Sequence, residues 1–200
     1  MSEKIVCKKC KSEFDNKEWS ENYNVCPKCN YHSYIGAFER LNILVDEGSF
    51  VEYDAELHSI NPLNFPNYED AIQKSYERTG LRSEMLSGEA SIGGNKIAIC
   101  IGDAGFIIGS MGSVIGEKIT RCVERAIEKR LPLVIISAFG GGARMQEGTI
   151  SLMQMAKTAA ACARYKKEGL FYIDVLTDPT MGGTAASFAS LGHIIIAEPG

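Results

Sequence analysis

Two CxxC pairs near the N-terminus constrain the fold of this chain more than any other feature. The pairs CKKC and CPKC supply Cys7 and Cys10, then Cys26 and Cys29, with fifteen residues between the pairs. Four thiolates at this spacing can surround one zinc ion as a tetrahedron. A module of about thirty residues buries too little apolar surface to fold without such help. We therefore predict a zinc ribbon over residues 1–33, with two strands between the pairs and a closed, structural metal site.

A redox dithiol and a pair of disulfides are the alternative uses of these four cysteines. A redox CxxC pair normally opens a helix after a strand, and neither pair stands in that context. His32 follows the last cysteine, and we expect it at the surface because four thiolates already complete a zinc shell. Cys100, Cys122 and Cys162 lie in apolar or helical stretches, where a free thiol behaves as a small hydrophobic side chain.

The N-terminal residues contain no apolar stretch of signal-peptide length, and no segment has the eighteen or so apolar residues that span a bilayer. Free thiols are typical of a reducing compartment, so we expect a cytoplasmic protein without membrane contact. The formal net charge of −4 weighs against a nucleic-acid-binding protein. Six lysines make the metal module locally basic, so weak RNA or DNA contact there is kept as a hypothesis: Lys4, Lys8, Lys9, Lys11, Lys17 and Lys28.

Residues 34–102 alternate between amphipathic and turn-rich segments. A short helix is expected before Gly48, with one apolar face made of Phe38, Leu41, Leu44 and Val45. Residues 50–57 alternate like a strand, and residues 68–80 are typical of a surface helix that Gly80 ends. Strands at 84–92 and 96–102 should form a hairpin, because Gly93, Gly94 and Asn95 supply its turn.

Beyond Gly102, apolar strands alternate with helices, and this alternation predicts an α/β core. We expect helices at 113–130, 149–169 and 184–192, and strands at 131–139, 170–177 and 193–198. The strands are continuous apolar runs rich in β-branched residues, as in strands covered on both faces.

Glycine clusters stand at three strand-to-helix junctions: GSMGS at 109–113, GGGARMQEG at 140–148 and DPTMGGTAAS at 178–187. None matches a P-loop or a dinucleotide-binding fingerprint. Each offers unobstructed backbone N–H groups at a helix start, where an oxyanion can bind, although tight turns alone would also explain any one cluster. Carboxyl ends of neighbouring parallel strands lie side by side, so we predict an oxyanion hole made by Gly141, Gly142, Gly182 and Gly183.

A nucleophilic triad is not indicated by this sequence. The three histidines, His32, His58 and His193, stand in no recognisable nucleophile motif. For His193, which opens an apolar strand, we expect a packing or capping role. Arg144, Gln146 and Glu147 begin the helix after the second glycine cluster, and two interpretations stay open for them: a solvated first turn, or a role in shaping an acyl site.

Taken together, the cysteine quartet and the motifs GSMGSV, GGARMQEG, SLMQMAKT, LTDPTMGG, ASFA and IAEP resemble the carboxyltransferase beta-subunit family of bacterial and plastid-type acetyl-CoA carboxylases, from Cys7 to Gly200. The resemblance implies a crotonase-like spiral of ββα units over residues 34–200. It also implies carboxyl transfer from carboxybiotin to acetyl-CoA, giving malonyl-CoA for fatty acid synthesis, with two backbone N–H groups stabilising the thioester enolate.

In this family an alpha subunit completes the active site, so the resemblance implies an α2β2 assembly served by a biotin carboxyl carrier protein and a biotin carboxylase. The cluster Gly109, Ser110, Met111 and Gly112 is expected to contact coenzyme A, with a structural turn as the alternative. The stretch before GGAR is one residue longer than usual, so the inward amide is that of Gly141, Gly142 or Ala143. The family normally continues past EPG, and we expect apolar surface exposed at the C-terminal edge.

Two rival functions remain from the sequence. The first is a non-catalytic zinc-ribbon protein that binds nucleic acid or regulates assembly through its basic N-terminal module. The second is a crotonase-like hydratase or isomerase, which the lack of a glutamate pair in the second glycine cluster disfavours.

Overall fold

The computed structural model describes residues 4–199. The chain divides into two compact units, Met1–Ile35 and Gly36–Gly200, and each is considered by itself. No helix in the described part of the chain is both long and apolar enough to cross a membrane.

The first unit is built around its two cysteine pairs. Strands β1 (Lys4–Val6) and β2 (Glu13–Asp15) are antiparallel and flank the first pair, and an isolated bridge between Val25 and His32 flanks the second. Helix α1 (Asn16–Glu21) occupies the middle of the segment between the pairs and buries Trp19. The prediction of two strands between the pairs is therefore wrong, because each pair sits in the turn of its own short hairpin.

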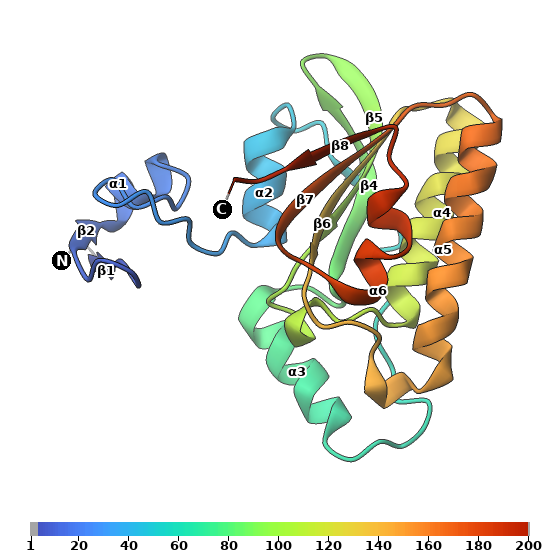
Figure 1. Ribbon diagram of the computed structural model, residues 1–200, viewed down its shortest axis with the longest axis horizontal. Helices are drawn as coiled ribbons and strands as arrows, with labels where there is room; N and C mark the ends of the chain where they lie inside the picture. The colour runs from blue at the N-terminus through green and yellow to red at the C-terminus, as the bar shows by residue number, and fades with distance from the viewer. Residues whose placement is uncertain (1–3, 200) are drawn as a thin grey trace. The chain divides into compact units, whose positions relative to one another are not determined.

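The second unit contains a six-stranded sheet with the order β3-β4-β5-β6-β7-β8. Strands β3 to β5 are antiparallel, and β5 to β8 are parallel (Figure 1). Their bounds are β3 Val51–Glu52, β4 Met85–Ile92, β5 Asn95–Gly102, β6 Leu133–Phe139, β7 Tyr172–Thr180 and β8 Ile194–Ala197. The predicted β4–β5 hairpin is present; its turn consists of Gly93 and Gly94, both with positive φ, and Asn95, expected in the turn, begins β5.

Helices cover both faces of this sheet. Helices α4 and α5 run side by side on one face, and α2 lies on the other (Figure 1). The longer helices are α2 Ala37–Leu44, α3 Tyr68–Thr79, α4 Ser113–Lys129 and α5 Thr149–Lys167. Shorter turns are the 3₁₀ helices Ile107–Gly109, Met145–Glu147 and Phe188–Ser190, and helix α6 Gly182–Ala185.

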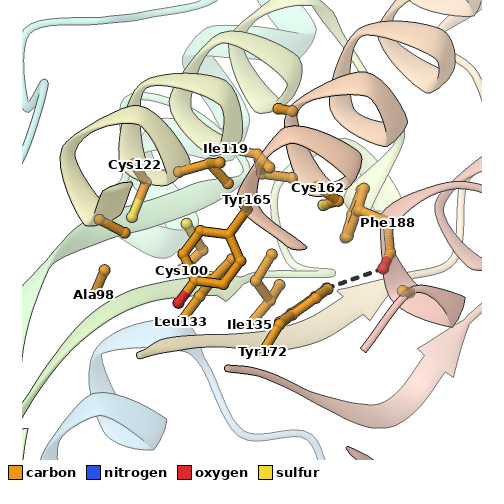
Figure 2. Packing of buried hydrophobic residues seen from close by; sticks show 14 of the residues in the cluster. Ala98, Cys100, Ile119, Cys122, Leu133, Ile135, Cys162, Tyr165, Tyr172 and Phe188 are labelled. Carbon is orange, nitrogen blue, oxygen red and sulfur yellow. Dashed lines mark hydrogen bonds between the residues drawn. The ribbon is translucent and has the colours of Figure 1, made fainter. Parts of the chain in front are cut away.

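Alternate residues of each central strand enter two separate cores. Leu133 and Ile135 of β6 pack toward α4 and α5, whereas Val134 and Ile136 pack toward α2. Figure 2 shows the first core, in which Cys100, Cys122 and Cys162 are fully buried free thiols, as predicted. A sheet covered on both faces explains the continuous apolar runs of the strands.

Three expected elements differ from the structure. The predicted helix before Gly48 ends at Leu44, and it buries Ala37 and Leu41 while Phe38 and Leu44 remain exposed. The predicted strand at 50–57 shortens to Val51–Glu52, after which Asp54 adopts a positive φ and the chain leaves the sheet. The expected helix at 184–192 is split into α6 and the 3₁₀ turn after it.

Candidate functional site

Two glycine loops meet at the carboxyl edge of the parallel strands. We call residues 140–144 the β6 loop and residues 181–184 the β7 loop. Strands β6 and β7 are adjacent and parallel, so both loops leave the same edge of the sheet, as predicted. A Cβ atom added at Gly182 would lie 3.2 Å from the Cα atom of Gly142 and 3.8 Å from its amide nitrogen. The two loops are thus in contact through glycines that have positive φ, +61° at Gly142 and +59° at Gly182.

The backbone N–H groups of these loops are not used to hold the fold together. Within residues 4–199, no hydrogen bond engages the amide of Gly141, Gly142 or Ala143, nor that of Gly182 or Gly183. The neighbouring amides differ, since Gly140 donates to Ile108 O at 3.2 Å and Met181 donates to Phe139 O at 3.0 Å. The tips of both loops therefore carry donors that are free for a ligand, while the loop bases are fixed.

The first glycine cluster, residues 109–112, supports the β6 loop. Met111 donates its amide to Gly142 O at 2.7 Å, and Arg144 donates its amide to Met111 O at 2.9 Å, which forms a short parallel bridge. A Cβ atom at Gly141 would lie 2.8 Å from Ser110 Cβ, and one at Gly109 would lie 2.8 Å from Ala138 O. All four predicted coenzyme A contacts, Gly109 to Gly112, are buried in this packing. Their contact with coenzyme A stays a prediction.

The start of helix α4 is occupied by carboxylates of this chain. Gly112 donates its amide to Glu84 Oε1 at 3.3 Å, and Ser113 donates to Glu147 Oε2 at 2.6 Å. The partial positive charge at a helix N-terminus favours such anions. In this cluster the amides of Gly112 and Ser113 are therefore already bonded within the chain, which leaves the β6 and β7 loops as the oxyanion candidates.

Arg144 and Glu147 do not form a solvated first turn, so that interpretation is wrong for both. Both side chains are fully buried, and the guanidinium Nη2 lies 2.8 Å from Glu84 Oε1. Burial alone would lower the pKa of Arg144, but the charges of Glu84 and Glu147 and the Tyr68 hydroxyl raise it above its ordinary value. The pKa of the Tyr68 hydroxyl is also raised, and there burial is the main cause. Gln146 is half-buried.

The histidines take no part in a nucleophilic site. His58 is exposed and contacts Glu56 O, while His193 accepts a hydrogen bond from Tyr172 N at 3.1 Å and stacks on Phe171. His32 is exposed. The packing role expected for His193 agrees with these contacts.

Exposed apolar side chains border both glycine loops. Met145 follows the β6 loop and is 70% exposed, Met181 begins the β7 loop and is 55% exposed, and Ile108 beside them is 69% exposed. Apolar side chains grouped at the mouth of a site in this way are typical of a binding surface.

The four cysteines of the first unit form a cluster that can hold a metal ion. Their sulfur atoms all lie within 4.8 Å of one another, with Cys7 to Cys29 at 3.7 Å and Cys10 to Cys26 at 3.6 Å. A tetrahedron of zinc–sulfur bonds of about 2.3 Å has edges of about 3.8 Å, so the sulfurs fit such an ion. They are too far apart for disulfides, whose sulfurs are about 2 Å apart.

The lysines of the metal module are exposed, but several already have partners. Lys4 pairs with Glu13, Lys17 with Glu21, and Lys28 donates to Ser12. Nucleic-acid contact by this module stays a prediction.

Sequence reasoning missed the buried cluster beneath the β6 loop. Its members are Arg144, Glu84, Glu147, Tyr68, Ser59 and Ser110, and we call it the Arg144 cluster. Tyr68 and Ser59 are 76 and 85 residues from Arg144 in the chain. The sequence offered one signal for this cluster: Arg144 and Glu147 stand just after the glycines that follow a buried strand, an unusual position for two charged residues.

The sequence is similar to those of known carboxyl transferases. The sequence profile of the family described as carboxyl transferase domain matches residues 35–199. The acetyl-coenzyme A carboxylase carboxyl transferase subunit beta of Desulforamulus reducens is 56% identical over 98% of this chain and 68% of its own length. A Clostridium tetani protein named subunits beta/alpha of the same enzyme is 53% identical over 97% of this chain and 34% of its own length.

The fold is also similar to that of solved carboxyl-transferring enzymes. Transcarboxylase 12S, solved with methylmalonyl-coenzyme A and methylmalonic acid bound, superposes with a TM-score of 0.66 at 26% identity, over 81% of this chain and 29% of that one. The chain spans about two thirds of the length of the curated beta subunits that it matches.

Proposed function

This chain belongs to the family of acetyl-coenzyme A carboxylase carboxyl transferase beta subunits, and on that premise we propose that its two glycine loops form the oxyanion hole of the carboxyl transfer reaction. The thioester of acetyl-CoA binds with its carbonyl oxygen between the β6 and β7 loops. One donor comes from Gly141, Gly142 or Ala143, and the other from Gly182 or Gly183. The observation that carries this proposal is that these amides lie on two loops that touch at Gly142 and Gly182 and have no acceptor within residues 4–199.

The free amides match the charge that the reaction creates. Removal of a methyl proton beside a thioester places negative charge on the carbonyl oxygen, and each donor fixed where that charge grows contributes about 3 to 4 kcal/mol. Carboxybiotin, delivered on a carrier protein as the second substrate, supplies the carboxyl group and a ureido nitrogen that can accept the proton. No side chain of this chain is then needed as the base.

A hydratase or isomerase function is less well supported. Such chemistry requires an acid or base beside the acyl group, and Glu147 is the acidic side chain nearest to the β6 loop in sequence. Its two carboxylate oxygens are buried and accept hydrogen bonds from Tyr68 OH at 2.7 Å and Ser113 N at 2.6 Å. It is therefore committed to the packing beneath the loop.

We further propose that an alpha subunit completes the site, in an α2β2 assembly that also meets the biotin carboxyl carrier protein and biotin carboxylase. The exposed apolar side chains at the loops, Met145, Met181 and Ile108, supply surface for the acyl group and the partner. The four-cysteine cluster binds one structural zinc ion, because a closed set of four thiolates suits zinc and leaves no open position for catalysis.

Carboxyl-transfer turnover with purified alpha subunit tests this function, with carboxybiotin generated from free biotin by biotin carboxylase, ATP and bicarbonate. We expect acetyl-CoA to be carboxylated only when both chains are present, and propionyl-CoA to be a poorer substrate. Absence of turnover with either thioester, together with steep salt-sensitive binding of RNA or DNA by the chain, would favour the non-catalytic alternative.

A further inference from the structure

We propose that Arg144 is the positioning residue of this site: its buried guanidinium holds the β6 loop so that the free amides of Gly141 to Ala143 stay aimed at the thioester. This inference rests on the proposed function of the loops. The residue acts through the backbone beside it and does not touch the substrate.

The guanidinium is fully satisfied by the Arg144 cluster. Nε donates to Ser110 Oγ at 3.0 Å, Nη2 donates to Ser110 O at 2.7 Å, and Nη2 forms an ion pair with Glu84 Oε1 at 2.8 Å. Nη1 donates to acceptors on three further residues, Ser59 Oγ at 3.0 Å, Tyr68 OH at 3.1 Å and Glu147 Oε1 at 3.4 Å. These six acceptor atoms surround the five N–H groups of the arginine, whose planar fork fixes the directions of its donors.

The contacts to Ser110 connect the guanidinium to the glycines. Ser110 takes two of the hydrogen bonds, one on its hydroxyl and one on its carbonyl. Its backbone lies so close beneath Gly141 that a Cβ atom there would be 2.9 Å from Ser110 Cα. Beside it, the backbone of Met111 bonds both Gly142 O and Arg144 N. The side chain of Arg144 thus bonds Ser110 and its main chain bonds Met111, so both hold the same segment that supports the glycines.

The β6 loop needs such an external support. Its three consecutive glycines have no side chains with which to pack, and glycine is the residue with the widest backbone freedom. Donors stabilise a developing oxyanion only when they are already oriented before the reaction. A charge buried at 1% exposure is costly unless it is paired and hydrogen-bonded, and the two glutamates that pair with Arg144 also bind the first amides of α4. The same cluster thus ties the loop to the longest elements of the unit.

A pair of serine substitutions tests the role of Arg144 in the complex of this chain with the alpha subunit. Ser110→Ala removes the acceptor of Nε and leaves the substrate-facing amides chemically intact. Ser87→Ala is the matched control, because Ser87 is also fully buried and its hydroxyl bonds one carbonyl, Tyr53 O at 3.1 Å, in strand β4. Each variant loses one buried hydrogen bond.

We expect Ser110→Ala to lower kcat for acetyl-CoA carboxylation by about tenfold, the effect of 1.4 kcal/mol, with KM for acetyl-CoA nearly unchanged. Ser87→Ala should keep the kcat of the unchanged complex when both are assayed well below their melting temperatures. Equal kcat in the two variants would overturn the inference, as would a Ser110→Ala effect confined to KM, which would instead make Ser110 a coenzyme A contact. If the unchanged complex itself is inactive, the proposed function fails rather than this inference.

Discussion

At the scale of single residues, the hydrogen-bond partners of Asp174 indicate the protonation state of this buried carboxyl group. Its carboxyl lies fully buried in β7, with Tyr172 OH 2.6 Å from Oδ2 and Ser137 Oγ 2.9 Å from Oδ1. The Tyr172 hydroxyl also lies 2.9 Å from Phe188 O, a bond drawn in Figure 2. One hydroxyl proton cannot serve both acceptors, so a neutral Asp174 that donates its own proton to Tyr172 satisfies the set.

The pKa of Asp174 agrees with this count. Burial raises it to about 7, although the hydrogen bonds from Tyr172 and Ser137 act to lower it. The folded state therefore keeps a proton that the unfolded chain releases near pH 4. Stability should fall as pH rises from about 4 to 7, by up to about 1.4 kcal/mol per pH unit, and then level off.

Asp174→Asn provides the comparison, since asparagine is neutral at every pH. We expect the difference in unfolding free energy between the variant and the unchanged chain to shift in favour of the variant between pH 4 and 7. Urea unfolding of both proteins at a series of pH values measures this difference in unfolding free energy. Parallel curves for the two proteins would show that Asp174 ionises normally.

A second prediction at this scale concerns Gly142. Gly142→Ala and Gly94→Ala both place a Cβ atom at a positive φ, +61° and +79°, with no atom within 4 Å. Each should lose about 1 to 2 kcal/mol of stability through backbone strain. Only Gly142 lies at the proposed oxyanion hole, so we expect kcat of the complex with the alpha subunit to fall by about ten- to a hundredfold in that variant alone.

Steady-state kinetics with both variants checks this prediction, with thermal melting as the measure of strain. Comparable stability losses with equal kcat values would mean that the amide of Gly142 has no role in turnover.

Single residues differ in how far the sequence could predict them. The cysteine quartet and the glycines were predictable, because a metal shell and a positive φ each select very few residue types. The burial of Arg144 was not, because its partners Tyr68 and Ser59 come from a distant turn-rich segment, and only the fold brings them beneath the loop.

At the scale of elements, the apolar periodicity of the sequence predicted most of the strands and helices that pack in the core. Strands β6 and β7 and helices α4 and α5 were expected close to their observed bounds, because each buries a strong apolar run or face. The apolar face expected for helix α2 is only partly confirmed: Leu41 and Val45 pack against the core of the sheet, whereas Phe38 and Leu44 are exposed and the small Ala37 is buried instead. In a helix of eight residues, one apolar side chain more or less decides the apparent face.

The metal module is the element that should respond to metal removal. Its core contains little beyond Cys7, Cys26 and Trp19, so the metal must supply much of its folding free energy. We expect Cys26→Ser, or a strong zinc chelator, to unfold the first unit and expose Trp19, the one tryptophan of the chain. The fluorescence of Trp19 reports this directly, and metal analysis should find one zinc per chain.

The second unit should be unaffected by that change. Far-UV circular dichroism should retain the thermal transition of the α/β core, because the two hydrophobic clusters of this unit are built from its own residues, between Ala37 and Leu191. Unchanged Trp19 fluorescence after complete loss of zinc would contradict the structural role of the metal.

At the scale of the whole molecule, the parallel topology determines where chemistry can occur. Strands β5, β6 and β7 end at one edge of the sheet. The segment that follows β5 supports the β6 loop, while the β6 and β7 loops present backbone amides that have no acceptor within residues 4–199. Sequence reasoning predicted this convergence from glycine clusters at successive strand ends. For the first cluster it left a coenzyme A contact and a structural turn open; the structure shows these residues packed beneath the β6 loop, and the coenzyme A contact stays a prediction.

The outer surface of the sheet adds a second feature at this scale. Ile194, Ile195 and Ile196 of β8 are each about half exposed, so the last described strand presents apolar side chains. The exposed apolar side chains of the unit therefore include the isoleucines of β8 as well as Met145 and Met181 at the loops.

The most direct measurement of the central claim is a crystal structure of this chain with the alpha subunit and bound acetyl-CoA. We predict that the thioester carbonyl oxygen lies within about 2.7 to 3.1 Å of one amide nitrogen from Gly141 to Ala143 and of another from Gly182 or Gly183. A carbonyl oxygen bound elsewhere, or these amides turned to protein carbonyls in the complex, would contradict the account.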